Sequence, residues 1–152
     1  SDRFGIDAAF LWNKSRLTSA TADLISIVRD ASLADGRSSL PNVADLNARL
    51  AVRASGPLFA DWSWDMNAAI RYTGKSRLGL GKRFDHVQGG YFQSNLVVRV
   101  TRENVSLFTS LSNLTNDKSS RFAIGNPLSP DTTNQYVPQR PVSVTIGADI
   151  SF

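Results

Sequence analysis

Residues 142–152 read VSVTIGADISF, and this stretch decides the fold. Every second residue from Val142 to Phe152 is apolar, whereas the residues between them are Ser, Thr, Gly and Asp. Successive side chains of a β-strand point to opposite faces of its sheet. An alternation of this length therefore predicts a strand with one apolar face and one polar face.

Five further segments, at residues 4–13, 46–55, 62–73, 92–101 and 105–112, repeat this alternation. Segment 105–112 is the least regular, because Phe108 and Thr109 fall on the wrong faces. No charged residue falls on the apolar face of any of the six segments. The charged residues of the other faces are Asp7, Arg49, Arg53, Asp65, Arg71, Arg99 and Asp149. The sequence therefore predicts an all-β chain with about six antiparallel strands.

The connections between these segments alternate in length. Those at Gly56-Pro57 and Glu103-Asn104 are short, whereas those at about 14–45, 74–90 and 113–141 are long and rich in Gly, Pro, Ser, Asn and Asp. In an up-and-down sheet, this order places the long loops at one end and the short turns at the other. Within the first long loop, residues 23–30 either prolong the first strand or form a short helix.

Composition narrows the function. The 152 residues include no Cys and a single His, His86, and no Ca²⁺-binding loop motif occurs, so we expect no metal site, no cofactor and no enzymatic nucleophile. The net charge of +4 comes from scattered residues, which argues against a nucleic-acid partner. No apolar run reaches about 18 residues, as a transmembrane helix would need, but a transmembrane strand needs only about 10.

The apolar face has two interpretations: it covers the core of a soluble sandwich, or it faces lipid. Four features favour lipid. Large aromatic residues stand at the strand ends, and the long loops share one end of the sheet. A ten-residue strand tilted by about 40° spans roughly 25 Å, the height of an outer-membrane apolar band. The chain also stops on an aromatic residue, Phe152, in phase with the apolar face.

Three motifs resemble TonB-dependent outer-membrane receptors. Arg140-Pro141 followed by a strand that ends on Phe152 resembles the last strand of that family's barrel. The run Asn113-Leu114-Thr115-Asn116-Asp117 resembles the Asn-Leu-Thr-Asp element after the penultimate strand. The run Leu40-Pro41-Asn42-Val43 is similar to the family's Leu-Pro-Asn-Val-Pro loop end, with Ala44 in place of the second Pro.

This resemblance implies that residues 1–152 are the C-terminal portion of a transmembrane β-barrel of about 22 strands, without the plug domain. Family members import scarce ligands, such as ferric siderophores, cobalamin or glycans, in the bacterial outer membrane. The implied partners are outer-membrane lipid and lipopolysaccharide, the protein's own plug domain, the TonB complex and the barrel assembly machinery. The C-terminus would be periplasmic and the long loops extracellular.

The resemblance also assigns candidate site residues. The terminal strand, with Ala148, Ile150 and Phe152, resembles the signal that the barrel assembly machinery reads. Four residues would face the lumen: Arg49, Arg53, Arg71 and Arg99. They could contact plug carboxylates or attract an anionic ligand, or they could simply pair with Asp7, Asp65 and Asp149.

Three other classes remain open at this point. A complete small barrel of about eight strands, with a structural or adhesion role, would need further strands near residues 24–29 and 122–125. An outer-membrane enzyme barrel would need a nucleophile and a base. A soluble β-sandwich binding module would not depend on detergent. Because six strands cannot close a barrel and open edges are not tolerated in lipid, we expect this chain not to be stable by itself.

Overall fold

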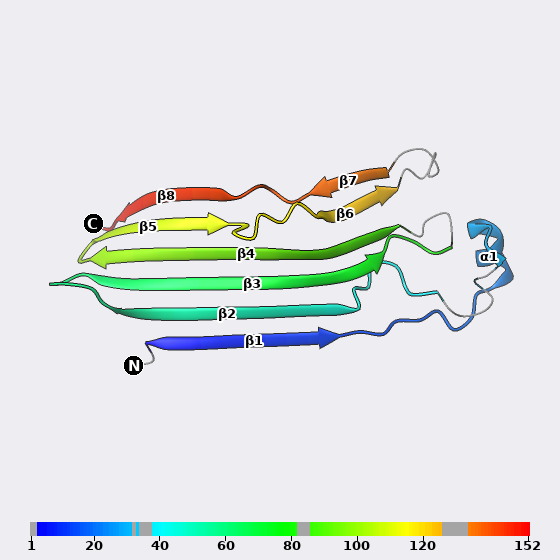
Figure 1. The fold of residues 1–152 in the computed structure, drawn as a ribbon, viewed down its shortest axis with the longest axis horizontal. Helices are drawn as coiled ribbons and strands as arrows, with labels where there is room; N and C mark the ends of the chain where they lie inside the picture. The colour runs from blue at the N-terminus through cyan, green and yellow to red at the C-terminus, as the bar shows by residue number, and fades with distance from the viewer. Residues whose placement is uncertain (1–2, 32, 34–37, 82–85, 126–133) are drawn as a thin grey trace.

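The computed structural model describes residues 3–31, 33, 38–81, 86–125 and 134–152, and it is dominated by one antiparallel sheet. Six strands form this sheet in the order β1-β2-β3-β4-β5-β8 (Figure 1). Their bounds are Phe4–Trp12 (β1), Leu46–Pro57 (β2), Ser63–Arg77 (β3), Val87–Arg102 (β4), Val105–Ser112 (β5) and Ser143–Ile150 (β8). The all-β, antiparallel prediction is confirmed, and each of the six predicted segments coincides with a strand.

The strands lie side by side in a single layer (Figure 1). The short connections, β2 to β3 and β4 to β5, lie at the end of the sheet that also holds both termini. At the opposite end lie helix α1 (Ala22–Val28), the connection from β3 to β4, and a separate hairpin of β6 (Ser120–Gly125) and β7 (Asn134–Pro138). The predicted separation of short and long connections is therefore confirmed.

The strand register brings the six apolar faces onto one face of the sheet. Across the middle of the sheet, Ala8 pairs with Leu50, Leu50 with Ile70, and Leu96 with Leu111. At the far strand, Leu107 pairs with Ala148 and Leu111 with Val144. Because the side-chain period is two, a slip of one residue in any pair would have moved polar side chains onto this face. We call this surface the apolar face, and the opposite one the polar face.

Aromatic residues border the apolar face at both ends. At the long-loop end, Phe10, Ala48, Tyr72 and Phe92 form one row across four strands, and the Tyr72 and Phe92 rings lie 4.9 Å apart. At the short-turn end lie Phe4, Phe59, Trp62 and Trp64. Trp64 and Tyr72 are eight residues apart in β3, which is about 27 Å along the strand and about 21 Å across a sheet tilted by 40°.

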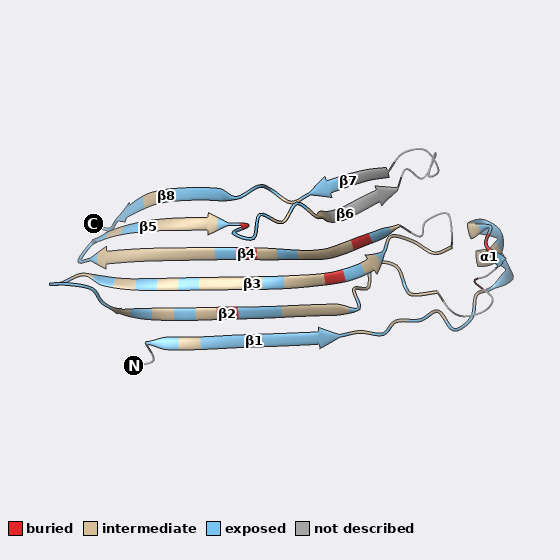
Figure 2. Cartoon of the chain, in the orientation of Figure 1, coloured by how far each residue is buried: buried red, intermediate tan, exposed pale blue. Residues whose placement is uncertain are grey.

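No layer of the described structure covers the apolar face. Trp12 is 71 % exposed, Phe10 72 % and Ile146 78 %. Among the described residues, the buried apolar side chains are only Leu33, in the segment after α1, and Ala51, on the polar face. Figure 2 shows that most of the main sheet is exposed or of intermediate burial. Removing one large apolar side chain from water is worth about 1.5–3 kcal/mol, and the whole stability of a domain is about 5–15 kcal/mol. A face of this size therefore requires an apolar cover.

The predicted long loops contain more regular structure than the alternation indicated. We expected residues 74–90 to form a loop, but β3 and β4 continue through the pairs Lys75–Gly89 and Arg77–Val87. The apolar alternation stops at Tyr72 and Phe92, whereas backbone pairing needs no apolar face and so continues. Residues 23–30, for which strand and helix were both open, lie mostly in helix α1, which begins after the N-cap Thr21.

The possible extra strand at 122–125 is real, but it pairs with β7 in a separate two-stranded sheet rather than joining the main one. Among the described residues the main sheet has six strands, with β1 and β8 at its two ends. The last strand also differs slightly from the prediction, because β8 ends at Ile150 and Phe152 lies two residues beyond it.

The irregular strand β5 is explained by a contact on the polar face. Phe108 pairs with Gly147 of β8, and a Cβ atom at Gly147 would overlap the Phe108 ring. On the other side, the Arg99 guanidinium lies 5.7 Å from the ring centroid, in cation–π range. Thr109 meanwhile lies between Val98 and Ile146 on the apolar face. The glycine therefore makes room for an aromatic side chain that would otherwise disrupt the pairing of β5 with β8.

The substitution Gly147→Ala should destabilise the protein by about 1–3 kcal/mol, because the added methyl group overlaps the Phe108 ring. The matched control is Gly5→Ala on the same face, where nothing lies within 4 Å of the new Cβ atom. Thermal unfolding followed by circular dichroism measures both variants. Equal melting temperatures for the two would contradict the packing role of Gly147.

Candidate functional site

The four predicted arginines all lie on the polar face. Arg49 pairs with Arg71 in the register, Arg53 with Asn67, and Arg99 with Asp65. Two of the four form ion pairs across strands: Arg53 Nη2 lies 2.7 Å from Asp7 Oδ2, and Arg99 Nη2 lies 3.7 Å from Asp149 Oδ2. Exposed pairs such as these contribute about 1 kcal/mol or less. The ion-pair partners of Arg53 and Arg99 are therefore carboxylates of the polar face, Asp7 and Asp149.

Arg49 and Arg71 are arranged differently, because they stand directly opposite each other on β2 and β3. Within the described residues, neither side chain has an ion pair or a hydrogen-bond partner. Their row continues to Ala9 on β1 and Gln93 on β4, so no carboxylate stands beside them. Like charges at directly opposed positions are unfavourable in an antiparallel pair.

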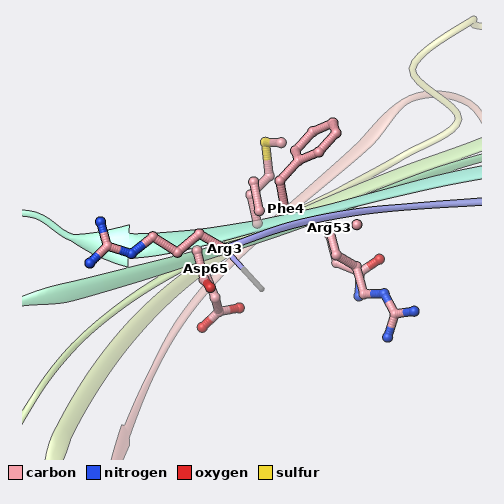
Figure 3. Close-up of a pocket in the computed structure, with 9 residues that line it drawn as sticks. Arg3, Phe4, Arg53 and Asp65 are labelled. Atoms are coloured by element: carbon pink, nitrogen blue, oxygen red, sulfur yellow. The ribbon is translucent and has the colours of Figure 1, made fainter. Parts of the chain in front are cut away.

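Two of the hollows on the polar face differ in charge. One, of about 480 Å³, is lined by residues that include Arg3, Arg53 and Asp65. Figure 3 shows Arg53 and Asp65 on one side of the sheet and Phe4 on the other. The second, of about 360 Å³, is lined by no acidic residue; its lining residues are Arg49, Arg71, Ala9, Phe10, Leu11, Asn47, Ala48 and Thr73. The first hollow contains charges of both signs, whereas the second contains only positive charge.

The terminal strand presents its candidate residues on the apolar face. Ala148 pairs with Leu107 and Ile150 with Val105, and both Ala148 and Ile150 are exposed. Phe152, beyond the end of β8, is fully exposed. Because β8 is the end strand of the sheet, these residues lie at an unpaired edge in the described structure.

Asn113 fixes the point at which the chain leaves β5 and returns to β8. Its side chain is buried and all four of its hydrogen-bonding positions are used. The amide nitrogen donates to the carbonyl oxygens of Asp117 (3.0 Å) and Arg140 (2.7 Å), and Oδ1 accepts from the Asp117 N–H (3.0 Å) and the Thr115 hydroxyl (3.3 Å). Asn113 has φ 54°, a left-handed conformation that Asn tolerates better than most residues. We call Asn113 and these bonds the Asn113 latch.

The latch continues onto β4, where β5 no longer runs alongside. Asp117 Oδ2 accepts from the Phe92 N–H (2.7 Å), and Gln139 Nε2 donates to the Phe92 carbonyl (2.7 Å). Side chains thus take the place of a neighbouring strand for this residue. Desolvation raises the pKa of Asp117, but hydrogen bonds from the Phe92 N–H and from the hydroxyl and N–H of Ser119 outweigh it, so the pKa is lowered overall.

Sequence reasoning singled out the Asn113 motif only through a resemblance and did not foresee its hydrogen bonds. The Leu40-Pro41-Asn42-Val43 motif plays a comparable part at the neighbouring loop. Asn42 also has a left-handed φ of 58°, its N–H donates to the Arg77 carbonyl (2.8 Å), and its Oδ1 accepts from Gln88 Nε2. The shared signal is an Asn that follows or precedes a strand in a polar loop, which is common in loops of every kind.

The long-loop end also holds a small buried cluster among the described residues. Leu33 is fully buried and Asp30 is 8 % exposed. Gly81, with φ 78°, lies so close to Val28 of α1 that a Cβ atom at position 81 would overlap that side chain. The loops at this end therefore pack on one another rather than extending independently.

Within the described part of the chain, no helix is long and apolar enough to cross a membrane, and no three or more His, Cys, Asp or Glu residues are grouped where they could hold a metal ion. Comparisons with models of protein families, with curated proteins and with solved structures find no match to this chain.

The substitution Asn113→Asp tests the latch, because a carboxylate keeps the shape and the acceptors but loses both donors. The carbonyl groups of Asp117 and Arg140 would then face a negative charge at the buried Asn113 position, and we expect a loss of about 2–3 kcal/mol in urea unfolding. Amide exchange in β8 should also become faster. The control is Asn95→Asp, at an exposed position of the polar face. Unchanged stability and unchanged exchange in β8 would show that the latch does not hold the last strand.

Proposed function

We propose that this chain is the C-terminal portion of a β-barrel in the bacterial outer membrane, with the apolar face towards lipid and the polar face towards a wet lumen. The observation that carries the proposal is the single apolar face formed by six strands, which nothing in the described structure covers. Lipid acyl chains would bury this apolar face without a second layer of protein. In a sandwich, by contrast, a second sheet packs on such a face at about 10 Å.

The borders of the apolar face support the same proposal. Aromatic side chains are enriched at both membrane interfaces of outer-membrane barrels. Here two aromatic borders lie about 21 Å apart across a tilted sheet, close to the apolar band of about 25 Å. Short turns at one end and long, structured connections at the other match periplasmic turns and extracellular loops.

Within that class we propose a TonB-dependent receptor, which imports a scarce ligand such as a ferric siderophore, cobalamin or a glycan. Two of the three motifs of the resemblance support this choice, because Asn42 and Asn113 each tie a long connection to a strand end. The unpaired edges of β1 and β8 would join the remaining strands of the barrel. Ala148, Ile150 and Phe152, exposed on the end strand, would be read by the assembly machinery, and the plug and TonB would act through the rest of the protein.

The test is deletion of the gene in its source bacterium, followed by uptake measurements with labelled ferric siderophores, cobalamin and glycans. We expect uptake of one ligand class to fall at least tenfold, and a protonophore to have the same effect on the parent strain. The full-length product should fractionate with the outer membrane. Unchanged uptake of all three classes would contradict the receptor assignment, and a soluble product would contradict the barrel as well.

A further inference from the structure

The feature that the proposed function leaves unexplained is the opposed pair Arg49 and Arg71. Directly opposed residues of an antiparallel pair have Cβ atoms about 4.5–5.5 Å apart, so these two positive side chains begin very close together. The other arginines of the polar face do not share this arrangement, because Arg53 and Arg99 each have an aspartate partner.

The rows on either side of the pair supply no free carboxylate. One neighbouring row on the same face is Leu11, Asn47, Thr73 and Tyr91, and the other is Asp7, Ala51, Ala69 and Asn95. Asp7 is the one acid among them, and its carboxylate is bonded to Arg53 at 2.7 Å. The two guanidinium groups therefore have no counter-charge among the described residues near them.

The space beside the pair is suited to an anion. The residues that line the hollow of about 360 Å³ include Arg49, Arg71, Asn47 and Thr73, whose side chains can all donate hydrogen bonds, beside the apolar Ala9, Phe10, Leu11 and Ala48. Small residues open this space, since Ala9, Ala51 and Ala69 flank the two arginines on the same face. Planar guanidinium groups match the two oxygens of a carboxylate in a bidentate geometry.

We propose that Arg49 and Arg71 form a binding site for a carboxylate, which lies between the two guanidinium groups on the polar face. The chemistry is the same whether the carboxylate belongs to a free organic anion or to a side chain of the same protein that lies against this face. Either source converts an unfavourable pair of like charges into a three-charge cluster. The inference stands on the polar face itself and rests on the proposed function only for the assignment of that face to a lumen.

The experiment compares melting temperatures of the full-length protein, purified in detergent at low ionic strength, with and without 10 mM citrate as the probe. The variants are Arg71→Gln and Arg49→Gln, and the control is Arg53→Gln in the other hollow. If the carboxylate belongs to the protein itself, Arg71→Gln and Arg49→Gln should both melt at a lower temperature than the parent protein, and the decrease should be larger than for Arg53→Gln. A free anion predicts that citrate raises the melting temperature of the parent protein but not of these two variants.

A different result is expected if no carboxylate lies between the two guanidinium groups. If the site is empty, removing one of two opposed charges relieves repulsion. Arg71→Gln would then melt at the same or a higher temperature than the parent, and citrate would change nothing, which would overturn the proposal. Arg71→Lys keeps the charge and covers the case in which a glutamine variant does not fold, and it should lie between the parent and Arg71→Gln. Because the readout is stability rather than uptake or localisation, failure of this site and failure of the receptor assignment give different results.

Discussion

The register of the six strands is the constraint on which the rest of the structure depends. It places every apolar alternation on the same side of the sheet, and a slip by one residue at any strand pair would turn the apolar side chains of the strands beyond that pair to the opposite face. The register between β5 and β8 is the hardest to set, because 30 residues separate Ser112 from Ser143 and those residues form a hairpin of their own. The Asn113 latch closes that excursion, and Gly147 admits Phe108 at the centre of the pairing.

The same register determines the chemistry of the polar face. Because charges occupy alternate positions in each strand, pairing decides which of them meet: Arg53 meets Asp7, Arg99 reaches Asp149, and Arg49 meets Arg71. The first two are ion pairs whose charges cancel within the sheet, whereas the third brings together two positive charges. Register thus decides which arginines of the polar face form ion pairs and which face a like charge.

Much of the fold follows from local pattern. Strands β1, β2 and β5 could be predicted closely, because alternation is a property of consecutive residues. The outer halves of β3 and β4 could not, since the apolar alternation stops at Tyr72 and Phe92 while the backbone pairing continues through Lys75 and Gln88. The positions of the arginines on the polar face were also predicted. Which of them lacks a carboxylate partner depends on the strand register, which cannot be read from the sequence of one strand alone. The Asn113 latch joins residues 27 positions apart, so local reasoning could not derive it.

Whether lipid covers the apolar face is best measured directly with single cysteines, because residues 1–152 contain no cysteine of their own. Single variants Leu50→Cys and Ile70→Cys on the apolar face, and Asn67→Cys and Asn95→Cys on the polar face, would carry an environment-sensitive fluorophore in the full-length protein, reconstituted in vesicles with brominated acyl chains. We predict strong quenching at the first two positions and little at the other two. No quenching at Leu50→Cys and Ile70→Cys, in a protein that is folded, would contradict a lipid-facing sheet.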